Sequence, residues 1–369
     1  MCSIVTSGGT EGAVAVTLEN VGGWPGILGK ILSGQDLTTD EASAALDDVL
    51  EGTATSAQIG AFVAGLRAKG ESVEEMIGLV RAMRAHGERL EVGVEVVDTC
   101  GTGGDRSGTI NVSTLSALVV AGAGAVVCKH GGRAASSLAG SADLLEALGV
   151  VIDLGPDGVR RCIDEVGIGF CFAPRFHPAM RYAAPVRREL GVATVFNFIG
   201  PLVNPAGAKR QLVGVSDPVM AIKMLHVLET FGSVHAMVVF GHDGLDELST
   251  TAPSTMIESV REPDGTCRRR RLEIEPASLG LKRAVLRDLR GGDAAHNARL
   301  GLRILDGERG PMRDLVCLNA AAALVVAGLA DDLADGFEIA SAAIDDGNAR
   351  SSLDRLISVS SAAAEAAAG

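Results

Sequence analysis

The sequence predicts an α/β protein, in which a small N-terminal helical domain precedes a larger domain with a central, mostly parallel sheet flanked by helices. Three observations support this fold class. Apolar residues between positions 24 and 90 recur at helical spacing. After residue 92, short β-branched runs alternate with helical stretches, which is typical of parallel strands joined by helices. The chain has 369 residues, which is long enough for two domains.

The helical domain is expected over residues 22–92, after a flexible tail over residues 1–21. Helix starts are marked three times by a Ser or Thr that stands three residues before Glu or Gln, at positions 38, 55 and 72. The apolar faces of these helices exceed what four short helices can bury among themselves. We therefore expect part of this surface to pack against a second copy of the chain. The expected helices span residues 27–32, 42–50, 57–69 and 73–86.

Residues 94–137 contain the most informative pattern in the chain. A β-branched run over residues 94–100 predicts a buried strand, and it ends in a glycine-rich turn that closes with Asp105. Glycines permit positive φ and allow several N–H groups to approach one anion. A helix running to about Val120 follows, and its start offers cap oxygens and hydroxyls at the positive end of the helix dipole. Phosphate is the anion that we expect such a turn to bind. The residues concerned are Gly101, Gly103, Gly104, Asn111, Ser113 and Thr114.

A second apolar run, over residues 123–128, leads into Lys129, His130 and the small-residue loop 131–137. Parallel strands end at the same edge of a sheet, so we expect the two loops to form one anion site there. The alternative is that these glycine-rich turns only connect elements, as a single such turn usually does. The combination of two loops with a lysine, a capping segment and an acidic residue favours the anion site.

The rest of the chain is expected to complete the α/β domain over residues 93–175 and 211–360. Proline-rich helical pieces interrupt it, and we expect the segment at about 176–210 to return to the helical domain, so that a second substrate pocket lies between the domains. A strand over 212–215, a helix through residue 228 and a strand over 236–240 follow. The last residues, 361–369, are of low complexity and are expected to be flexible.

Composition and charge restrict the possible partners. Hydrophobic residues make up 47% of the chain and charged residues 21%, as in globular proteins. The net charge of −13 argues against nucleic acid and anionic membranes as partners. The basic run 268–271 follows the turn at Asp264 and Gly265, and we interpret it as a solvated hairpin strand. No uncharged apolar run is long enough to span a membrane.

The cysteines and the N-terminus predict a cytoplasmic protein. The first residues lack the basic start and long apolar core of a secretion signal. The seven cysteines show neither C-x-x-C spacing nor the density of a disulfide scaffold, which fits a reducing compartment. They lie at positions 2, 100, 128, 162, 171, 267 and 317.

Taken in order, these motifs resemble those of the anthranilate phosphoribosyltransferases, which have the nucleoside phosphorylase/phosphoribosyltransferase fold. The resemblance covers about residues 22–360. It includes GTGGD at 101–105, N-x-S-T at 111–114, KHG-x-RAASS at 129–137, HPAM at 177–180, VRRELG at 186–191, DGLDE at 243–247, GGDA at 291–294 and LNAAA at 318–322.

The resemblance implies transfer of a phosphoribosyl group from 5-phosphoribosyl pyrophosphate (PRPP) to the amine of anthranilate, with release of pyrophosphate, in tryptophan biosynthesis. Departure of pyrophosphate leaves positive charge on the ribose carbon and negative charge on the leaving oxygens, so catalysis rests on positioning and charge stabilisation without a protein nucleophile. The resemblance also implies Mg²⁺ and a homodimer formed through the helical domain.

By match to the family motifs, each site residue has an expected role. Lys129 and Arg187 are expected to act electrostatically, and Arg187 to pair with the acceptor's carboxylate. The metal ligands would be Ser113, Asp246 and Glu247. The donor-binding residues would be Gly101, Thr102, Gly103, Gly104, Asp105, Thr109, Asn111, Ser113, Thr114, Lys129 and Ser137. The acceptor-binding residues would be His130, Gly131, Gly132, Pro174, His177, Met180, Tyr182 and Arg187.

Two of these assignments also have a purely structural interpretation. Asp246 and Glu247 could be an ordinary acidic loop after a strand. Arg187 is one of two adjacent arginines and could lie on an exposed helix face, as we expect for Arg188.

Two departures from the family pattern affect the expected substrate. Gly132 stands where the family generally has asparagine, and Arg106 where a glycine is frequent. Losing a neutral hydrogen bond costs about 0.5–1.5 kcal/mol, less than the about 1.5–3 kcal/mol expected of the arginine contact. An aromatic carboxylate therefore remains the expected acceptor, and a different aromatic acid is the next candidate. A pyrimidine nucleoside phosphorylase and a DNA-binding protein without enzymatic activity are two further hypotheses for this chain.

Overall fold

The computed structural model of the chain describes residues 16–105, 107–134 and 138–369. Most of the expected N-terminal tail, together with Arg106 and Ser137, lies outside these residues. The part of the tail that is described contains a 3-10 turn, η1 (Glu19–Val21).

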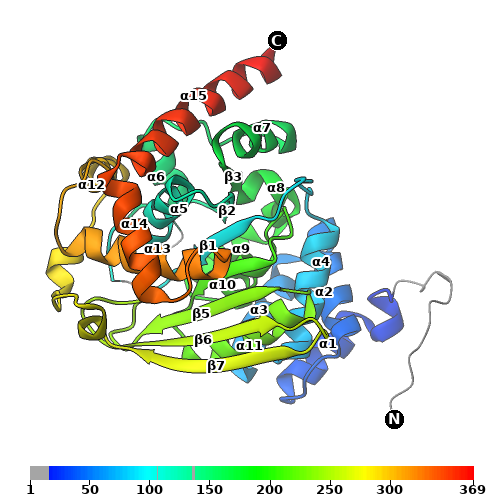
Figure 1. The fold of residues 1–369 in the computed structure, drawn as a ribbon. Coiled ribbons are helices and arrows are strands. Elements are labelled where there is room, and N and C mark those ends of the chain that lie inside the picture. The colour runs from blue at the N-terminus through cyan, green and yellow to red at the C-terminus, as the bar shows by residue number, and fades with distance from the viewer. Residues whose placement is uncertain (1–15, 106, 135–137) are drawn as a thin grey trace.

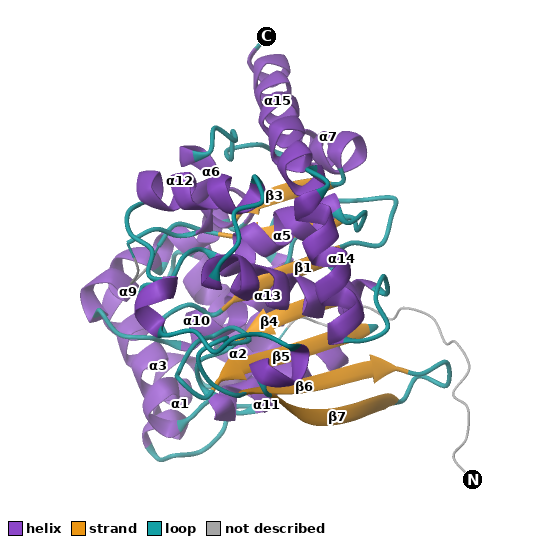
Figure 2. Ribbon diagram, turned by 60° about the vertical axis from the view of Figure 1, so that its left-hand side comes forward, coloured by secondary structure: helices purple, strands orange, loops and turns teal. Residues whose placement is uncertain are grey.

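Within the described residues, seven strands form one sheet in the order β3-β2-β1-β4-β5-β6-β7. The first five strands along the chain are parallel, and β6 and β7 form an antiparallel hairpin at one edge (Figure 2). This confirms the mostly parallel sheet. The strands are β1 (Val97–Gly101), β2 (Val127–Gly131), β3 (Ile168–Phe172), β4 (Arg210–Gly214), β5 (His235–Gly241), β6 (Ser254–Arg261) and β7 (Cys267–Ile274).

The second strand begins later than the sequence predicts. The prediction covers residues 123–128, whereas β2 begins at Val127. The preceding helix, α5 (Val112–Gly122), ends in a turn in which Gly124 adopts a φ of +99°. Lys129 and His130 are therefore strand residues in register with Phe170 and Cys171 of β3, rather than members of the following loop.

Helices cover both faces of the sheet (Figure 1). Alternate residues of a strand point to opposite faces, so Leu212 joins the core with α5 and α13, while Val213 joins a second core with the N-terminal helices. The helices of the first core are α5, α6 (Ser141–Ala147), α7 (Pro156–Val166), α12 (Ala294–Leu305), α13 (Pro311–Ala327), α14 (Leu333–Asp345) and α15 (Asn348–Ala368).

The N-terminal helices are α1 (Gly23–Leu32), α2 (Thr39–Glu51), α3 (Ser56–Lys69) and α4 (Val73–Ala85). The last three begin at the three expected start signals, each of which forms a capping box. Their apolar residues share the second core with α11 (Pro218–Thr230) and with one face of the sheet. The helical domain therefore has no separate core, and its own chain covers part of the apolar surface that we expected a second copy to cover.

The proline-rich segment returns to these N-terminal helices. Its apolar residues, such as Val186 and Phe198, belong to the second core. The segment contains α8 (Ala173–Phe176), η2 (Pro178–Tyr182), α9 (Ala184–Leu190), α10 (Val195–Ile199) and η3 (Gly200–Leu202). Two further 3-10 turns, η4 (Pro276–Leu279) and η5 (Leu286–Leu289), follow the hairpin.

The C-terminal segment differs from the expectation of a flexible tail over 361–369. Helix α15 continues to Ala368, and Ala363 is buried against the first core. Alanine has the highest intrinsic helix propensity, so a low-complexity run of alanines extends a helix that is already formed.

The expected hairpin is confirmed, with Gly265 in its turn at a φ of +84°. Arginines of the basic run project from the edge strand β7. Arg268, Arg269 and Arg270 each pair with a glutamate, which supports the interpretation of this run as a solvated strand. None of the described helices is both long and apolar enough to cross a membrane.

Candidate active site

A cleft of about 320 Å³ lies where β1 and β2 end at the carboxyl edge of the sheet. The loops after both strands line it, as do α10, η3 and the acidic pair that follows β5. Most of the expected site residues meet here: Gly101, Thr102, Gly103, Gly104, Asp105, Thr109, Asn111, Ser113, Lys129, His130, Gly131, Gly132, Arg187, Asp246 and Glu247. Thr114, Pro174, His177, Met180 and Tyr182 are not part of the lining, and Ser137 lies outside the described residues.

The glycines of the first loop serve two different purposes. Gly103 and Gly104 adopt φ values of +65° and +84°, which is the left-handed conformation expected of them. Gly101 does not have a positive φ, in contrast to the prediction. It is required because a Cβ atom there would collide with the carboxylate of Asp246.

Three carboxylates gather beside this loop. The backbone N–H of Gly103 donates to Oδ2 of Asp246 over 2.7 Å. Burial and the nearby charge of Asp105 raise the pKa of Asp246 to about 7. Burial and the charge of Asp246 also raise the pKa of Glu247, while Lys129 opposes this shift. These carboxylates are costly to ionise together, so the cluster favours a bound cation.

The donor set fits Mg²⁺. Among the described residues, no group of three or more His, Cys, Asp or Glu could hold a metal by itself. Mg²⁺ is commonly held by one or two carboxylates and completes its coordination with water and phosphate oxygens. Asp246 and Glu247, beside the glycine loop that follows β1, provide such an incomplete set.

The start of α5 differs from the prediction in two side chains. Asn111 does not cap the helix, because its Nδ2 donates to the carbonyl of Ala139 over 2.9 Å and its Oδ1 accepts from Asn297 over 2.9 Å. Asn111 lines the cleft and instead joins the loop at Ala139 to helix α12. Thr114 is buried and does not line the cleft itself, but its hydroxyl donates over 3.0 Å to Ser141 of α6, which does.

Lys129 is buried beneath the cleft. Its Nζ donates to the carbonyl of Thr99 over 2.5 Å and to Oγ of Ser113 over 3.3 Å. Burial lowers its pKa, while the carboxylate of Asp98 acts in the opposite direction. Asp98 is fully buried and accepts from the N–H of His130 over 3.2 Å and from Nδ2 of Asn204 over 2.8 Å. Lys129 and Asp98 are thus a buried pair of oppositely charged groups below the site that attract each other without a direct salt bridge between them in the described residues.

Arg187 projects from α9 at the opposite wall. Its guanidinium carbon lies 5.3 Å from the centre of the Phe196 ring, which belongs to α10. Burial lowers its pKa, and no salt bridge to a carboxylate exists for it within the described parts of the chain. An arginine without a partner in a cleft can pair with the carboxylate of a ligand.

The remaining expected acceptor residues do not line the cleft. His177 is buried, its Nε2 lies 3.2 Å from the carbonyl oxygen of Val203, and its ring packs edge-on to that of His130 at 5.2 Å between centres. Burial lowers the pKa of His130 to about 3 and that of His177 to about 4, so both rings are neutral at pH 7. Met180 packs into the second core, Tyr182 lies on the backbone of Gly52, and Pro174 is exposed at the start of α8.

Two protein-family models match most of this chain. The model of the glycosyl transferase family α/β domain matches residues 93–350, and the helical bundle domain of the same family matches residues 25–87. The anthranilate phosphoribosyltransferase of Thermomicrobium roseum is 53% identical over 92% of this chain and 98% of its own length. The chain belongs to the anthranilate phosphoribosyltransferase family.

Solved structures of anthranilate phosphoribosyltransferases have the same fold. The enzyme from Thermus thermophilus superimposes with a TM-score of 0.83 at 41% identity, over 90% of this chain and 99% of that one. The enzyme from Saccharomyces cerevisiae, in complex with PRPP and Mg, gives a TM-score of 0.82 at 26% identity, over 92% of this chain and 98% of that one. The yeast enzyme has also been solved with 4-fluoroanthranilate, with a TM-score of 0.81 at 25% identity.

Several side chains of the site in this anthranilate phosphoribosyltransferase family member were not assigned roles from the sequence. Phe196 and Asn197 line the cleft, and Asp98 and Asn204 form the buried network behind Lys129. Asn297 fixes Asn111 and accepts from the N–H of Gly292 over 2.7 Å. An isolated Asp inside an apolar strand was the one available signal for Asp98, because a buried carboxylate requires partners.

Proposed function

We propose that the chain transfers the phosphoribosyl group of PRPP to the amine of anthranilate and releases pyrophosphate. The observation that carries this proposal is the cleft in which two glycine-rich loops and an acidic pair face an unpaired arginine, Arg187. An anion-binding half and a carboxylate-binding half thereby open into the same space. The names of relatives that are about half identical over nine-tenths of the chain support the same activity.

Different residues of the cleft would bind the two substrates. Backbone N–H groups of the loop ending at Asp105 would hold the phosphates of PRPP. The buried Lys129, beneath this loop, would stabilise the negative charge of the bound phosphates. Mg²⁺ at Asp246 and Glu247 would neutralise charge that builds up on the leaving pyrophosphate. Arg187 would hold the acceptor's carboxylate so that the amine faces the ribose carbon.

The direct test is consumption of anthranilate by the purified chain with PRPP and Mg²⁺, followed by the loss of anthranilate fluorescence. Reactions without PRPP provide the control. No turnover at millimolar anthranilate would contradict the proposed function.

Replacing Arg187 with leucine should weaken acceptor binding selectively. A charge-assisted contact is worth about 1.5–3 kcal/mol, so KM for anthranilate should rise roughly 10- to 150-fold while KM for PRPP stays nearly constant. The adjacent Arg188→Leu variant is the matched control, because Arg188 is exposed and lines no part of the cleft. Equal effects of the two substitutions would exclude a specific role for Arg187.

Restoring asparagine at position 132 should leave the fold intact. A Cβ atom on Gly132 meets only the Cβ of Ala173, at 3.8 Å, which is ordinary contact. Gly132→Asn can therefore add one hydrogen bond at the cleft, and we expect KM for anthranilate to fall by up to about tenfold. A panel of aromatic acids, assayed by pyrophosphate release, compares the two proteins. An unchanged acceptor profile would remove Gly132 as a reason to consider another acid.

The exposed face of α3 supports a homodimer. This face consists of small residues, and Leu32 at the end of α1 is 78% exposed. Ala57, Ala61, Ala64 and Ala68 form an exposed apolar stripe opposite the buried face of α3, and a second apolar face of this kind is normally covered. We expect light scattering to give twice the chain mass of 37.7 kDa, and Ala64→Glu to yield monomers. The control Ala367→Glu, on the exposed end of α15, should remain dimeric; a monomeric wild-type chain would refute this interface.

A further inference from the structure

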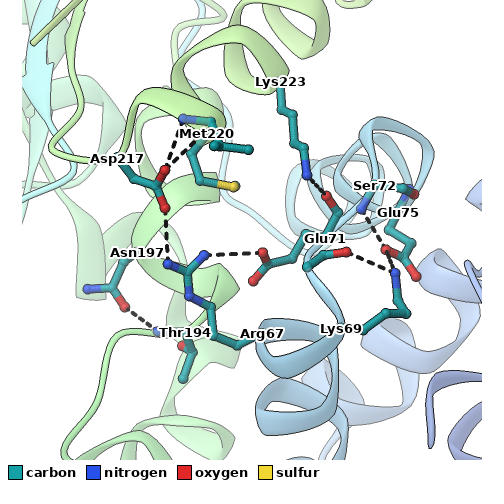
Figure 3. Close-up of polar contacts among 12 residues, drawn as sticks. Arg67, Lys69, Glu71, Ser72, Glu75, Thr194, Asn197, Asp217, Met220 and Lys223 are labelled. Atoms are coloured by element: carbon teal, nitrogen blue, oxygen red, sulfur yellow. Dashed lines mark hydrogen bonds and ion pairs between the residues drawn. The ribbon is translucent and has the colours of Figure 1, made fainter. Parts of the chain in front are cut away.

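Three segments of the fold meet at Arg67, near the end of α3. Its Nη2 donates to Oδ2 of Asp217 over 3.1 Å, and its Nη1 donates to Oε2 of Glu71 over 3.4 Å (Figure 3). The guanidinium carbon also lies 5.0 Å from the centre of the Phe198 ring in α10. One planar cation thus contacts the N-terminal helices, the helix α11 and the returning segment.

The two acidic partners are themselves fixed. Glu71 is fully buried, and its carbonyl accepts from Nζ of Lys223 in α11 over 2.6 Å. Its Oε1 has no hydrogen-bond partner within the described residues, so Arg67 is the cation on which this buried carboxylate depends. Asp217 caps α11 by accepting from the N–H groups of Val219 and Met220.

Through Phe198, Arg67 is connected to the wall of the cleft that is formed by α10 and Arg187. Helix α10 has only five residues, so its position depends on tertiary contacts rather than on its own hydrogen bonds. Phe196 and Asn197 of this helix line the cleft, and Arg187 packs over the ring of Phe196. The face of Phe198 that meets Arg67 therefore helps to determine where Arg187 stands.

Through Asp217, Arg67 is connected to the half of the cleft that the glycine loop lines. Asp217 follows the end of β4 by three residues. There the carbonyl of Gly214 accepts from the N–H of Thr102 in the glycine loop over 2.9 Å, and Gly214 packs against the backbone of Asp246. The two halves of the cleft are thus connected through Arg67.

We infer that Arg67 is a positioning residue for the aromatic acceptor: by contacting Phe198 and Asp217 together, it holds the wall that carries Arg187 at a fixed place relative to the phosphate-binding loop. This inference rests on the proposed function for its kinetic consequence. Its structural consequence, the anchoring of α10, does not depend on which reaction the cleft performs.

The test compares Arg67→Met with Arg81→Met. Methionine keeps an apolar stem and removes the charge and the planar face. Arg81, on α4, is exposed and pairs with Asp40, and within the described residues its hydrogen bonds and ion pair go to residues 39, 40 and 43 only, which makes it the matched control. We expect Arg67→Met to raise KM for anthranilate about tenfold or more, with KM for PRPP within about twofold of wild type. Arg67→Lys, which keeps the pair with Asp217 but not the planar face, should fall between the two.

A second measurement reports on α10 directly. Amide hydrogen exchange over residues 195–199 should be faster in Arg67→Met than in wild type and unchanged in Arg81→Met. Equal increases in both KM values, or a lower unfolding midpoint with unchanged KM values, would overturn the inference. If the wild-type chain shows no turnover, the proposed function fails and the exchange experiment alone decides: unchanged exchange over 195–199 then overturns the role of Arg67.

Discussion

Replacing Lys129 with methionine is expected to destabilise the protein by about 3–5 kcal/mol and to abolish turnover, because removing one member of a buried charge pair leaves the other without compensation. Lys129 is 2% exposed, and Asp98 is fully buried. Burial raises the pKa of Asp98, and the charge of Lys129 is the main factor that opposes this shift. Methionine fills the space of the lysine stem but leaves Asp98 without a cation. The free energy of unfolding, measured by urea titration, gives the effect.

Two further variants distinguish this cause from a general loss of packing. Lys282→Met changes an exposed lysine and should leave stability within about 0.5 kcal/mol. Adding Asp98→Asn to Lys129→Met should recover part of the lost stability, because the uncompensated charge is then gone. If the double variant were no more stable than Lys129→Met alone, charge compensation would not be the role of Lys129.

Asp246→Asn should reduce turnover roughly 100- to 1000-fold, because it removes a ligand of the Mg²⁺ that would stabilise the charge on the leaving pyrophosphate. At the same time it should not destabilise the metal-free protein at pH 8. The pKa of Asp246 is raised to about 7 in the folded chain, so the folded state binds more protons than the unfolded state between about pH 4 and pH 7. Stability without metal therefore falls as the pH rises through this range, by on the order of 4 kcal/mol if Asp246 alone titrates.

The asparagine variant lacks this titration, so its unfolding free energy should lose less between pH 4 and pH 8. In the wild type, Mg²⁺ and protons compete for the same carboxylate, and stabilisation by Mg²⁺ with PRPP should increase from about pH 5 to pH 8. Thermal unfolding with and without the metal measures both effects. Asp153→Asn, the same chemical change at an exposed position, is the control. A similar gain from Mg²⁺ in wild type and Asp246→Asn would argue against a metal site there.

Much of the site could be recognised from the sequence because each of its halves is local. The capping boxes at Thr38, Thr55 and Ser72 form between residues three apart, and the structure contains all three. The glycine loop after β1 and the loop after β2 are each continuous, and they meet because parallel strands end at one edge.

The errors concern residues whose roles depend on distant partners. The sequence predicts that Asn111 caps α5, yet its side chain bonds to Ala139 and to Asn297, which lies 186 residues away. The family motifs predict Tyr182 in the acceptor pocket, but the short turn η2 places its ring against Gly52. Neither partner could be inferred from the neighbouring sequence.

The sequence by itself determined the fold class, the helix starts and the two loops of the cleft, since short-range hydrogen bonding and hydrophobic periodicity decide these features. Only the tertiary structure decided that Asp98 compensates Lys129 and that Arg67 connects α10 with α11. The partners of a buried charge or of a single-turn helix are set by tertiary packing, and packing brings together residues that are far apart along the chain.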